Sequence, residues 1–249
     1  MRLFVASAPP YTALPHYVTP VRAAYRIEGG TLCALPQPEQ VRGGVLLITE
    51  QRDDDLRRVL PALLWECRRR HYGGVAVPFP APTLVAALRR PLREAGLSLW
   101  VNESDGLTAP DCRVLVNTAV TGGHLEERLT DACRAFGAER IVLDVQRLRT
   151  VYPLPCSNDG TPLSPDELYR LRQGRPVYYA GELGARYFTC RWQGKSGFVL
   201  FDDGDTLRRK IALGEQLHIP RALLTLPESE DILPEVLAKK GEPETNSGS

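Results

Sequence analysis

The sequence predicts an α/β protein built on a small or incomplete (β/α)₈ barrel of the TIM type. Apolar, strand-like runs alternate with helix-like segments between residues 43 and 226, a pattern typical of parallel strands joined by right-handed crossovers. Several runs have a continuously apolar centre, such as residues 45–48 and 114–116, as do strands buried on both faces. Seven or eight strands over about 200 residues suit a barrel. The alternative is an open doubly wound sheet, but no glycine-rich loop follows the first run, which disfavours it.

The expected elements follow one another from residue 43. Gly43 and Gly44 precede the first strand, and the aspartates at 53–55 begin a helix whose apolar positions end at Cys67. Pro61 lies within that helix and is expected to bend it. The later strands are expected at residues 74–78, 97–102, 113–117, 141–146, 176–180, 187–192, 198–201 and 221–226. The later helices are expected at residues 82–95, from about 121 to 136, after the cap Ser164-Pro165, and at 205–218.

The pattern divides the chain into three parts. Residues 1–42 are rich in Pro, Tyr and Ala without clear periodicity, and we interpret them as an N-terminal extension with edge strands at 23–27 and 31–34. Residues 43–237 form the barrel-like domain. Residues 238–249 are polar and are expected to form a disordered tail.

Composition excludes several classes of function. With a net charge of +1, bulk electrostatics favours neither nucleic acid nor an anionic membrane. No apolar run approaches the ~20 residues of a membrane span. The apolar run at the start of the sequence is also too short for a signal peptide. The six cysteines form no CxxC pair and the four histidines are dispersed, so we expect reduced thiols, no metal, no cofactor and a cytoplasmic location.

Polar residues at the carboxyl ends of barrel strands are the candidates for function, because chemistry sits at that end of such barrels. The catalytic candidates are Asp144, Glu50, Glu103 and Glu228. The ligand-binding candidates are Asp144, Gln146, Asn117, Asn102 and Tyr178. For each of the three glutamates, a solvated loop carboxylate is the favoured interpretation, and a catalytic acid is the alternative. Asp144 suits a functional carboxylate or a structural ion pair, and Gln146 suits a structural hydrogen bond or a ligand contact.

Two segments resemble family-18 glycoside hydrolases, the chitinase-like barrels. The first is the hairpin at 187–201, followed by Asp202-Asp203, Leu207, Lys210 and the closing strand. The second is the strand that ends Asp144-Val145-Gln146, which is similar to the acidic strand Asp-x-x-Asp-x-Asp-x-Glu of that family. The resemblance implies a barrel fold and a substrate-assisted mechanism in which a glutamic acid protonates the glycosidic oxygen.

The acidic strand departs from the family pattern. Glu139 and Val142 stand in place of the first two aspartates, Gln146 stands in place of the catalytic glutamate, and only Asp144 matches. The last strand also lacks the family's tryptophan. General acid catalysis typically supplies about 10²- to 10⁴-fold in rate, and a carboxamide cannot donate that proton. We therefore expect a catalytically degenerate protein that binds a glycan or a protein partner at the mouth of the barrel. The alternative is an active glycoside hydrolase whose carboxylate comes from another strand.

Overall fold

The computed structural model describes residues 1–52, 56, 58–155 and 160–238. The chain divides into two compact units. The barrel unit comprises Met1–Gln146 and Ile211–Pro227, and the insert unit comprises Arg147–Lys210 and Glu228–Ser249. The expected helix start at 53–55 and, apart from Ala238, the expected tail at 238–249 lie outside the described residues.

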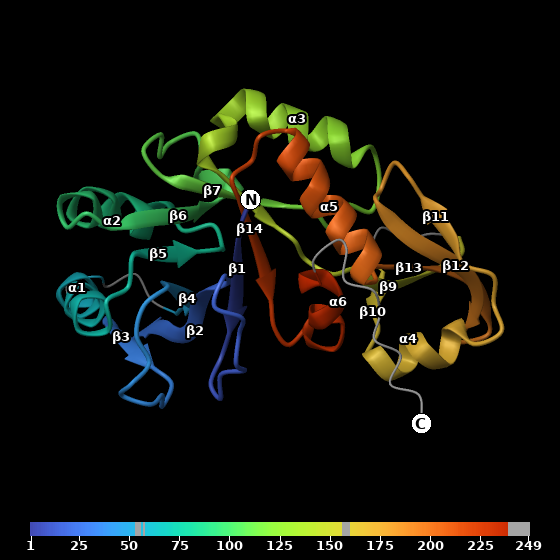
Figure 1. Cartoon of the computed structure of the whole chain (residues 1–249), viewed down its shortest axis with the longest axis horizontal. Helices are drawn as coiled ribbons and strands as arrows, with labels where there is room; N and C mark the ends of the chain where they lie inside the picture. The colour runs from blue at the N-terminus through green and yellow to red at the C-terminus, as the bar shows by residue number, and fades with distance from the viewer. Residues whose placement is uncertain (53–55, 57, 156–159, 239–249) are drawn as a thin grey trace. The chain divides into compact units, whose positions relative to one another are not determined.

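The barrel unit holds eight parallel strands, which close into a barrel and confirm the predicted fold class (Figure 1). The strands are β1 (Arg2–Ser7), β2 (Thr19–Glu28), β4 (Val45–Gln51), β5 (Gly74–Val77), β6 (Ser98–Asn102), β7 (Arg113–Asn117), β8 (Ile141–Asp144) and β14 (Arg221–Thr225). Their order is β1-β14-β8-β7-β6-β5-β4-β2, and pairing of β1 with β2 closes the ring. Strand β3 (Thr31–Ala34) pairs antiparallel with β2.

The interpretation of residues 1–42 as an extension outside the barrel is wrong, although the edge strand expected at 31–34 is present as β3. Strand β1 pairs with β14 on one side and with β2 on the other, and β2 also pairs with β4. Both strands therefore belong to the closed barrel. The run in β1 has only six residues and is followed by prolines, so nothing local distinguishes it from an isolated edge strand. Its partner β14 lies at the far end of the sequence.

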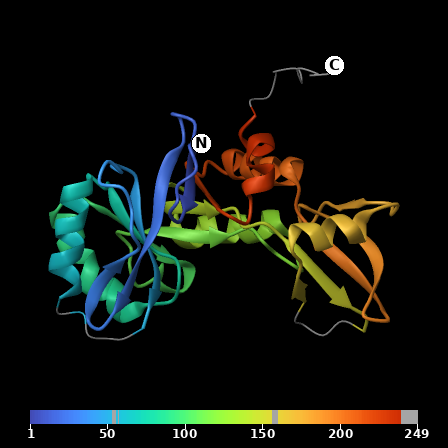
Figure 2. The same ribbon diagram turned by 90° about the horizontal axis from the view of Figure 1, so that it is seen from below.

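Helices cover the outside of part of the barrel. In Figures 1 and 2, α1 (Val59–Arg70) and α2 (Pro82–Glu94) lie outside the strands that they connect. Helix α3 (Leu125–Phe136) links β7 to β8, and the last part of α5 (Gly204–Gln216) leads to β14. Pro61 does not bend α1, because it lies in the first turn, where an amide hydrogen has no helical partner to lose. Helix α3 begins later than predicted because Gly123 has a φ of 75°, outside the helical range.

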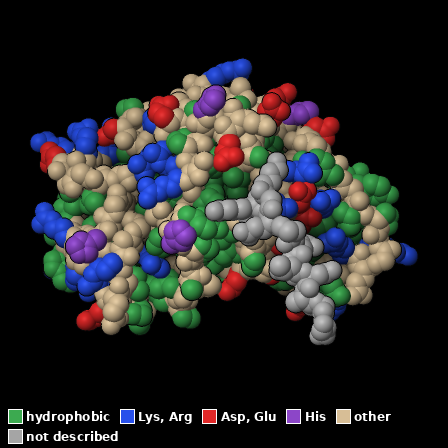
Figure 3. Space-filling model, in the orientation of Figure 1, with side chains coloured by type: hydrophobic (Ala, Val, Ile, Leu, Met, Phe, Trp, Pro, Cys, Tyr) green, Lys and Arg blue, Asp and Glu red, His purple; other side chains and the backbone are tan. Residues whose placement is uncertain are grey.

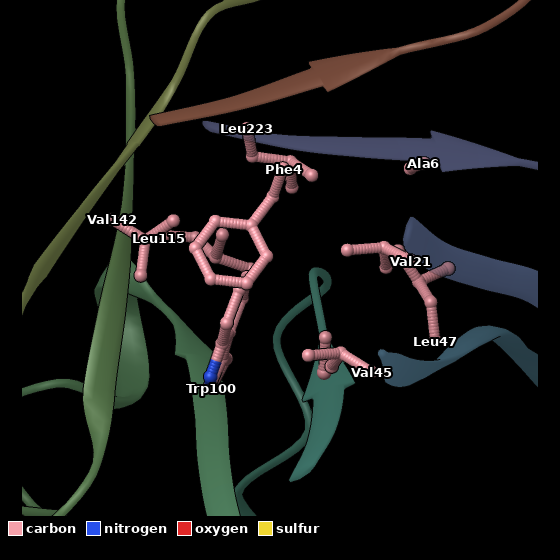
Figure 4. Close-up of a cluster of buried hydrophobic side chains, with 10 residues drawn as sticks. Phe4, Ala6, Val21, Val45, Leu47, Trp100, Leu115, Val142 and Leu223 are labelled. Carbon is pink, nitrogen blue, oxygen red and sulfur yellow. The ribbon is translucent and has the colours of Figure 1, made fainter. Parts of the chain in front are cut away.

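The middle of the barrel is filled with apolar side chains. Figure 4 shows Phe4, Val45, Leu115, Val142 and their neighbours pointing toward one another from the surrounding strands. The rings of Phe4 and Trp100 meet edge to face, with centroids 4.8 Å apart at an interplanar angle of 85°. The buried members of this core are Phe4, Ala6, Val21, Val45, Leu47, Ala76, Trp100, Leu115, Val142 and Leu223. Because the core plugs the lumen, ligands can reach only the two ends of the barrel.

The insert unit is built on a five-stranded antiparallel sheet of order β10-β9-β13-β12-β11. The strands are β9 (Arg149–Pro153), β10 (Thr161–Pro162), β11 (Tyr178–Ala180), β12 (Ala185–Trp192) and β13 (Lys195–Phe201). Helix α4 (Pro165–Arg172) contributes Leu168 to the apolar cluster on this sheet, and α6 (Leu233–Leu237) belongs to the same unit. The sequence pattern had assigned β11, β12 and β13 to the barrel, and this was wrong. In β12 buried and more exposed residues alternate, as in antiparallel sheets with one solvated face.

The charged surface is mixed in sign. Acidic and basic side chains are interspersed on the face drawn in Figure 3. Over the part of the chain that the structure describes, no helix is long and apolar enough to cross a membrane.

The start of α4 gives a first prediction. The Ser164 side chain accepts a hydrogen bond from the Glu167 amide at 3.2 Å, and the Glu167 carboxylate accepts one from the Ser164 amide at 2.8 Å. This reciprocal pair is a capping box. Replacing Ser164 with alanine is expected to lower the free energy of unfolding by about 1 kcal/mol, measured by urea denaturation. The exposed Ser196, on β13 of the same unit and replaced in the same way, controls for loss of a hydroxyl, and an unchanged midpoint for Ser164→Ala would contradict the prediction.

Candidate functional site

The carboxyl ends of β7 and β8 place Asn117 and Asp144 side by side, because these two residues are register partners. Leu115 and Val142 belong to the barrel core. Residues two apart on a strand share a face, so Asn117 and Asp144 also face the inside of the barrel, at its C-terminal end. Asp144 is only 9% exposed.

Gln146 joins these two side chains in a hydrogen-bonded chain. Its Nε2 donates to Asp144 Oδ2 at 2.7 Å, and its Oε1 accepts from Asn117 Nδ2 at 3.0 Å. Asn117 Oδ1 accepts in turn from the Ala119 amide at 2.6 Å. Because the Ala119 amide is a donor, the side-chain oxygen of Asn117, and not its nitrogen, must face it. The orientation of Asn117 then determines that of Gln146, so the nitrogen of Gln146 must face the carboxylate.

This arrangement determines what the site can do chemically. Asp144 supplies a carboxylate, while the neighbouring position supplies an amide that donates hydrogen bonds but does not titrate. Of the three side chains, only Asp144 can take up or release a proton.

Two further residues support the site and were not predicted from the sequence. Thr118 is fully buried, and both its amide and its hydroxyl donate to the Asp144 carbonyl, at 3.0 and 3.3 Å. Arg128, on α3, donates through Nε to the Asn117 carbonyl at 3.2 Å and binds Glu103 at 2.6 Å. The position of Thr118 directly after a predicted strand was a usable signal. No sequence signal pointed to Arg128, because only the packing of α3 places it beside β7.

None of the remaining candidates in the barrel unit has a described hydrogen bond directly to Asp144, Gln146 or Asn117, although Glu103 is linked to Asn117 through Arg128. In the barrel unit, Glu103 is paired with Arg128, and Glu50 with Arg52 at 3.0 Å. Asn102 holds its own loop, since Nδ2 donates to the Pro78 carbonyl and Oδ1 accepts from the Ser104 amide. Glu228 and Tyr178 belong to the insert unit. Within the barrel unit, hydrogen bonds therefore join Asp144, Gln146 and Asn117 directly, while Glu50 and Glu103 are each paired with an arginine.

Two buried thiols of the barrel unit are poor nucleophiles. Burial raises the pKa of Cys67 to about 12 and that of Cys112 to about 11, so both are protonated at neutral pH, and the thiolate is the reactive form. Within the described ranges, no three His, Cys, Asp or Glu side chains are grouped to hold a metal ion.

The barrel, its plugged lumen and the carboxylate at the end of β8 define the class: the chain has a chitinase-type, glycoside-hydrolase-like fold. A chitinase from Rhizomucor miehei superposes with a TM-score of 0.68 at 13% identity, covering 95% of this chain and 99% of that one. The spore cortex-lytic enzyme SleL of Bacillus megaterium gives 0.64 at 14% identity, covering 94% and 72%. A chitinase-like agglutinin from Robinia pseudoacacia gives 0.56 at 10%, covering 88% and 90%. The sequence itself matches no protein-family model and no curated protein.

Proposed function

We propose that this protein is a catalytically degenerate relative of glycoside hydrolases that binds a glycan carrying N-acetylated sugars at the C-terminal end of its barrel, without cleaving it. The binding groups are Asp144, Gln146 and Asn117. A carboxylate and two carboxamides are groups that recognise sugar hydroxyls and acetamido groups through hydrogen bonds.

One observation carries the proposal. Gln146 occupies the position at which a proton donor is expected. Its amide Nε2 donates a hydrogen bond to Asp144 Oδ2 at 2.7 Å. An amide held in this orientation positions a carboxylate and a ligand, and it has no proton to give.

The hydrogen-bonding capacity of the site supports binding. Each primary amide nitrogen carries two hydrogens, and the contacts of Asn117 and Gln146 described above use one in each. The second can serve a sugar oxygen. Gln146 is exposed, so a ligand can reach it. A solved structure with this fold is described as an agglutinin, a name that denotes binding rather than cleavage, and this favours a glycan over a protein partner.

The test is titration of the protein with N-acetylglucosamine oligomers by calorimetry, together with an assay for their hydrolysis. We expect saturable binding, no cleavage, and an affinity that is about 10- to 100-fold weaker in Asp144→Ala, because a hydrogen bond to a charged group contributes about 1.5–3 kcal/mol. Asp131→Ala, on the exposed face of α3, is the matched control and should bind like the native protein. Absence of binding, or cleavage that Asp144→Ala abolishes, would overturn the proposal.

The alternative, an active hydrolase with its acid on another strand, makes a different prediction. Hydrolysis would then survive Gln146→Ala and be lost in Glu50→Gln, Glu103→Gln or Glu228→Gln. In the structure Glu50 and Glu103 are each bound to an arginine, so each of these carboxylates already has a protein partner.

A further inference from the structure

Three arginines lie together at the N-terminal end of the barrel, opposite to the candidate glycan site. Arg2, Arg113 and Arg221 each begin a strand, β1, β7 and β14. Arg2 and Arg221 are register partners. The residues two positions further along these strands are Phe4, Leu115 and Leu223, all members of the barrel core. Because alternate residues share a face, the three arginines form the layer directly beneath that core.

The contacts of these guanidinium groups are all with neutral acceptors. Arg2 Nε donates to Thr19 Oγ1 at 3.1 Å, Arg113 Nη1 to Ser98 Oγ at 3.4 Å, and Arg221 Nη1 to the Glu139 carbonyl at 2.9 Å. Two of them also lie over core rings, Arg2 at 5.4 Å from the Phe4 centroid and Arg113 at 5.8 Å from that of Trp100.

This cluster lacks counter-charges among the residues that the structure describes. None of the three arginines forms an ion pair, whereas arginines elsewhere are paired with acids, for example Arg128 with Glu103. The carboxylate of Glu215 is bound to the amino group of Met1 at 3.1 Å. Burial, and after it the positive charges of Arg221 and Arg2, lowers the pKa of Arg113 to about 10. Burial and Arg2 also lower the pKa of Arg221.

We propose that this end of the barrel binds a phosphate-type oxyanion, with Arg2, Arg113 and Arg221 as its ligands. Guanidinium groups present planar pairs of donors that match the oxygens of phosphate. A polyvalent anion would also offset the mutual repulsion of three neighbouring cations. The hydroxyls of Thr19 and Ser98, which already contact Arg2 and Arg113, add polar groups to the rim. This site is separate from the glycan site and does not depend on it.

The first test is calorimetric titration of the native protein with inorganic phosphate, pyrophosphate and glucose 6-phosphate at low ionic strength, with thermal unfolding in parallel. We expect binding of at least one of them and a rise in Tm on its addition. Preference for glucose 6-phosphate would identify a phosphomonoester as the ligand, and preference for the inorganic anions would identify free phosphate. Failure of all three to bind at millimolar concentration would overturn the proposal.

The second test compares Arg113→Gln and Arg221→Gln with the control Arg90→Gln, an exposed arginine on α2. Each of the first two is expected to weaken anion binding about 10-fold, while the control binds as the native protein does. Without anion, both variants should unfold at a Tm equal to or above that of the native protein, because like-charge repulsion is relieved. A purely structural role for the arginines predicts the opposite, a lower Tm with and without anion and undiminished affinity, and that result would overturn the proposal.

Discussion

Replacing Lys210 with methionine is expected to lower the free energy of unfolding of the insert unit by about 3–5 kcal/mol. Lys210 Nζ donates to Asp202 Oδ2 at 2.8 Å, and both side chains are fully buried, with 0% exposure. The Leu148 amide and the Thr206 hydroxyl complete the carboxylate's contacts, each at 2.9 Å. Loss of the ammonium leaves a buried carboxylate without its counter-charge, which costs far more than the pair itself contributes.

Chemical denaturation, followed by fluorescence and circular dichroism, measures this effect. Lys195→Met, in the exposed β12–β13 turn of the same unit, controls for the removal of a lysine and should change stability by less than about 0.5 kcal/mol. The double variant Asp202→Asn/Lys210→Met should recover part of the loss, because it removes the unpaired charge. A loss of less than 1 kcal/mol in Lys210→Met would contradict the burial of this ion pair.

Replacing Gln146 with glutamate is expected to destabilise the protein by about 1–2 kcal/mol at pH 8 and to have little effect at pH 4. The introduced carboxyl would stand at the position from which Nε2 now donates to Asp144, so two carboxylates would be adjacent. Repulsion raises the pKa of the pair above that in the unfolded chain. The penalty is therefore absent below the unfolded pKa and appears as the pH rises through the folded one. The loss of unfolding free energy is small because Gln146 is exposed and solvent screens the repulsion.

Denaturation at pH 4, 6 and 8 tests this prediction, with Gln216→Glu at the exposed end of α5 as the control. A loss of stability that is the same at all three pH values would show that the two side chains are not coupled. The same variant also tests the proposed loss of catalysis, since it adds a proton donor with a raised pKa. Hydrolysis of N-acetylglucosamine oligomers that appears in Gln146→Glu and not in Gln146→Ala would show that the missing acid was the main defect.

The candidate site was largely predictable because it depends on strand ends. Parallel strands of a barrel bring their carboxyl ends together, so Asn117, Asp144 and Gln146 could be expected at one mouth before any coordinates were known. Tyr178 was assigned to the same mouth because the insert was interpreted as part of the barrel, and Glu228 because it follows the barrel strand β14; both belong to the other unit. The Asp202 and Lys210 positions, which carry the resemblance to family-18 enzymes, form a buried ion pair in the insert unit rather than part of the candidate site.

The sequence by itself determined the local properties of this protein: the buried parallel strands from β4 to β8, the amphipathic helices α2 and α3, the capping box of α4, and the identity of Gln146 beside an acid. Each of these follows from a periodicity or a residue type within a short window. Only the tertiary structure decided that β1 and β2 close the ring, that 147–210 folds as a separate antiparallel unit, and that Arg2, Arg113 and Arg221 share one end of the barrel. These features depend on pairing between residues far apart in the chain, and such pairing leaves no mark on the sequence near either partner.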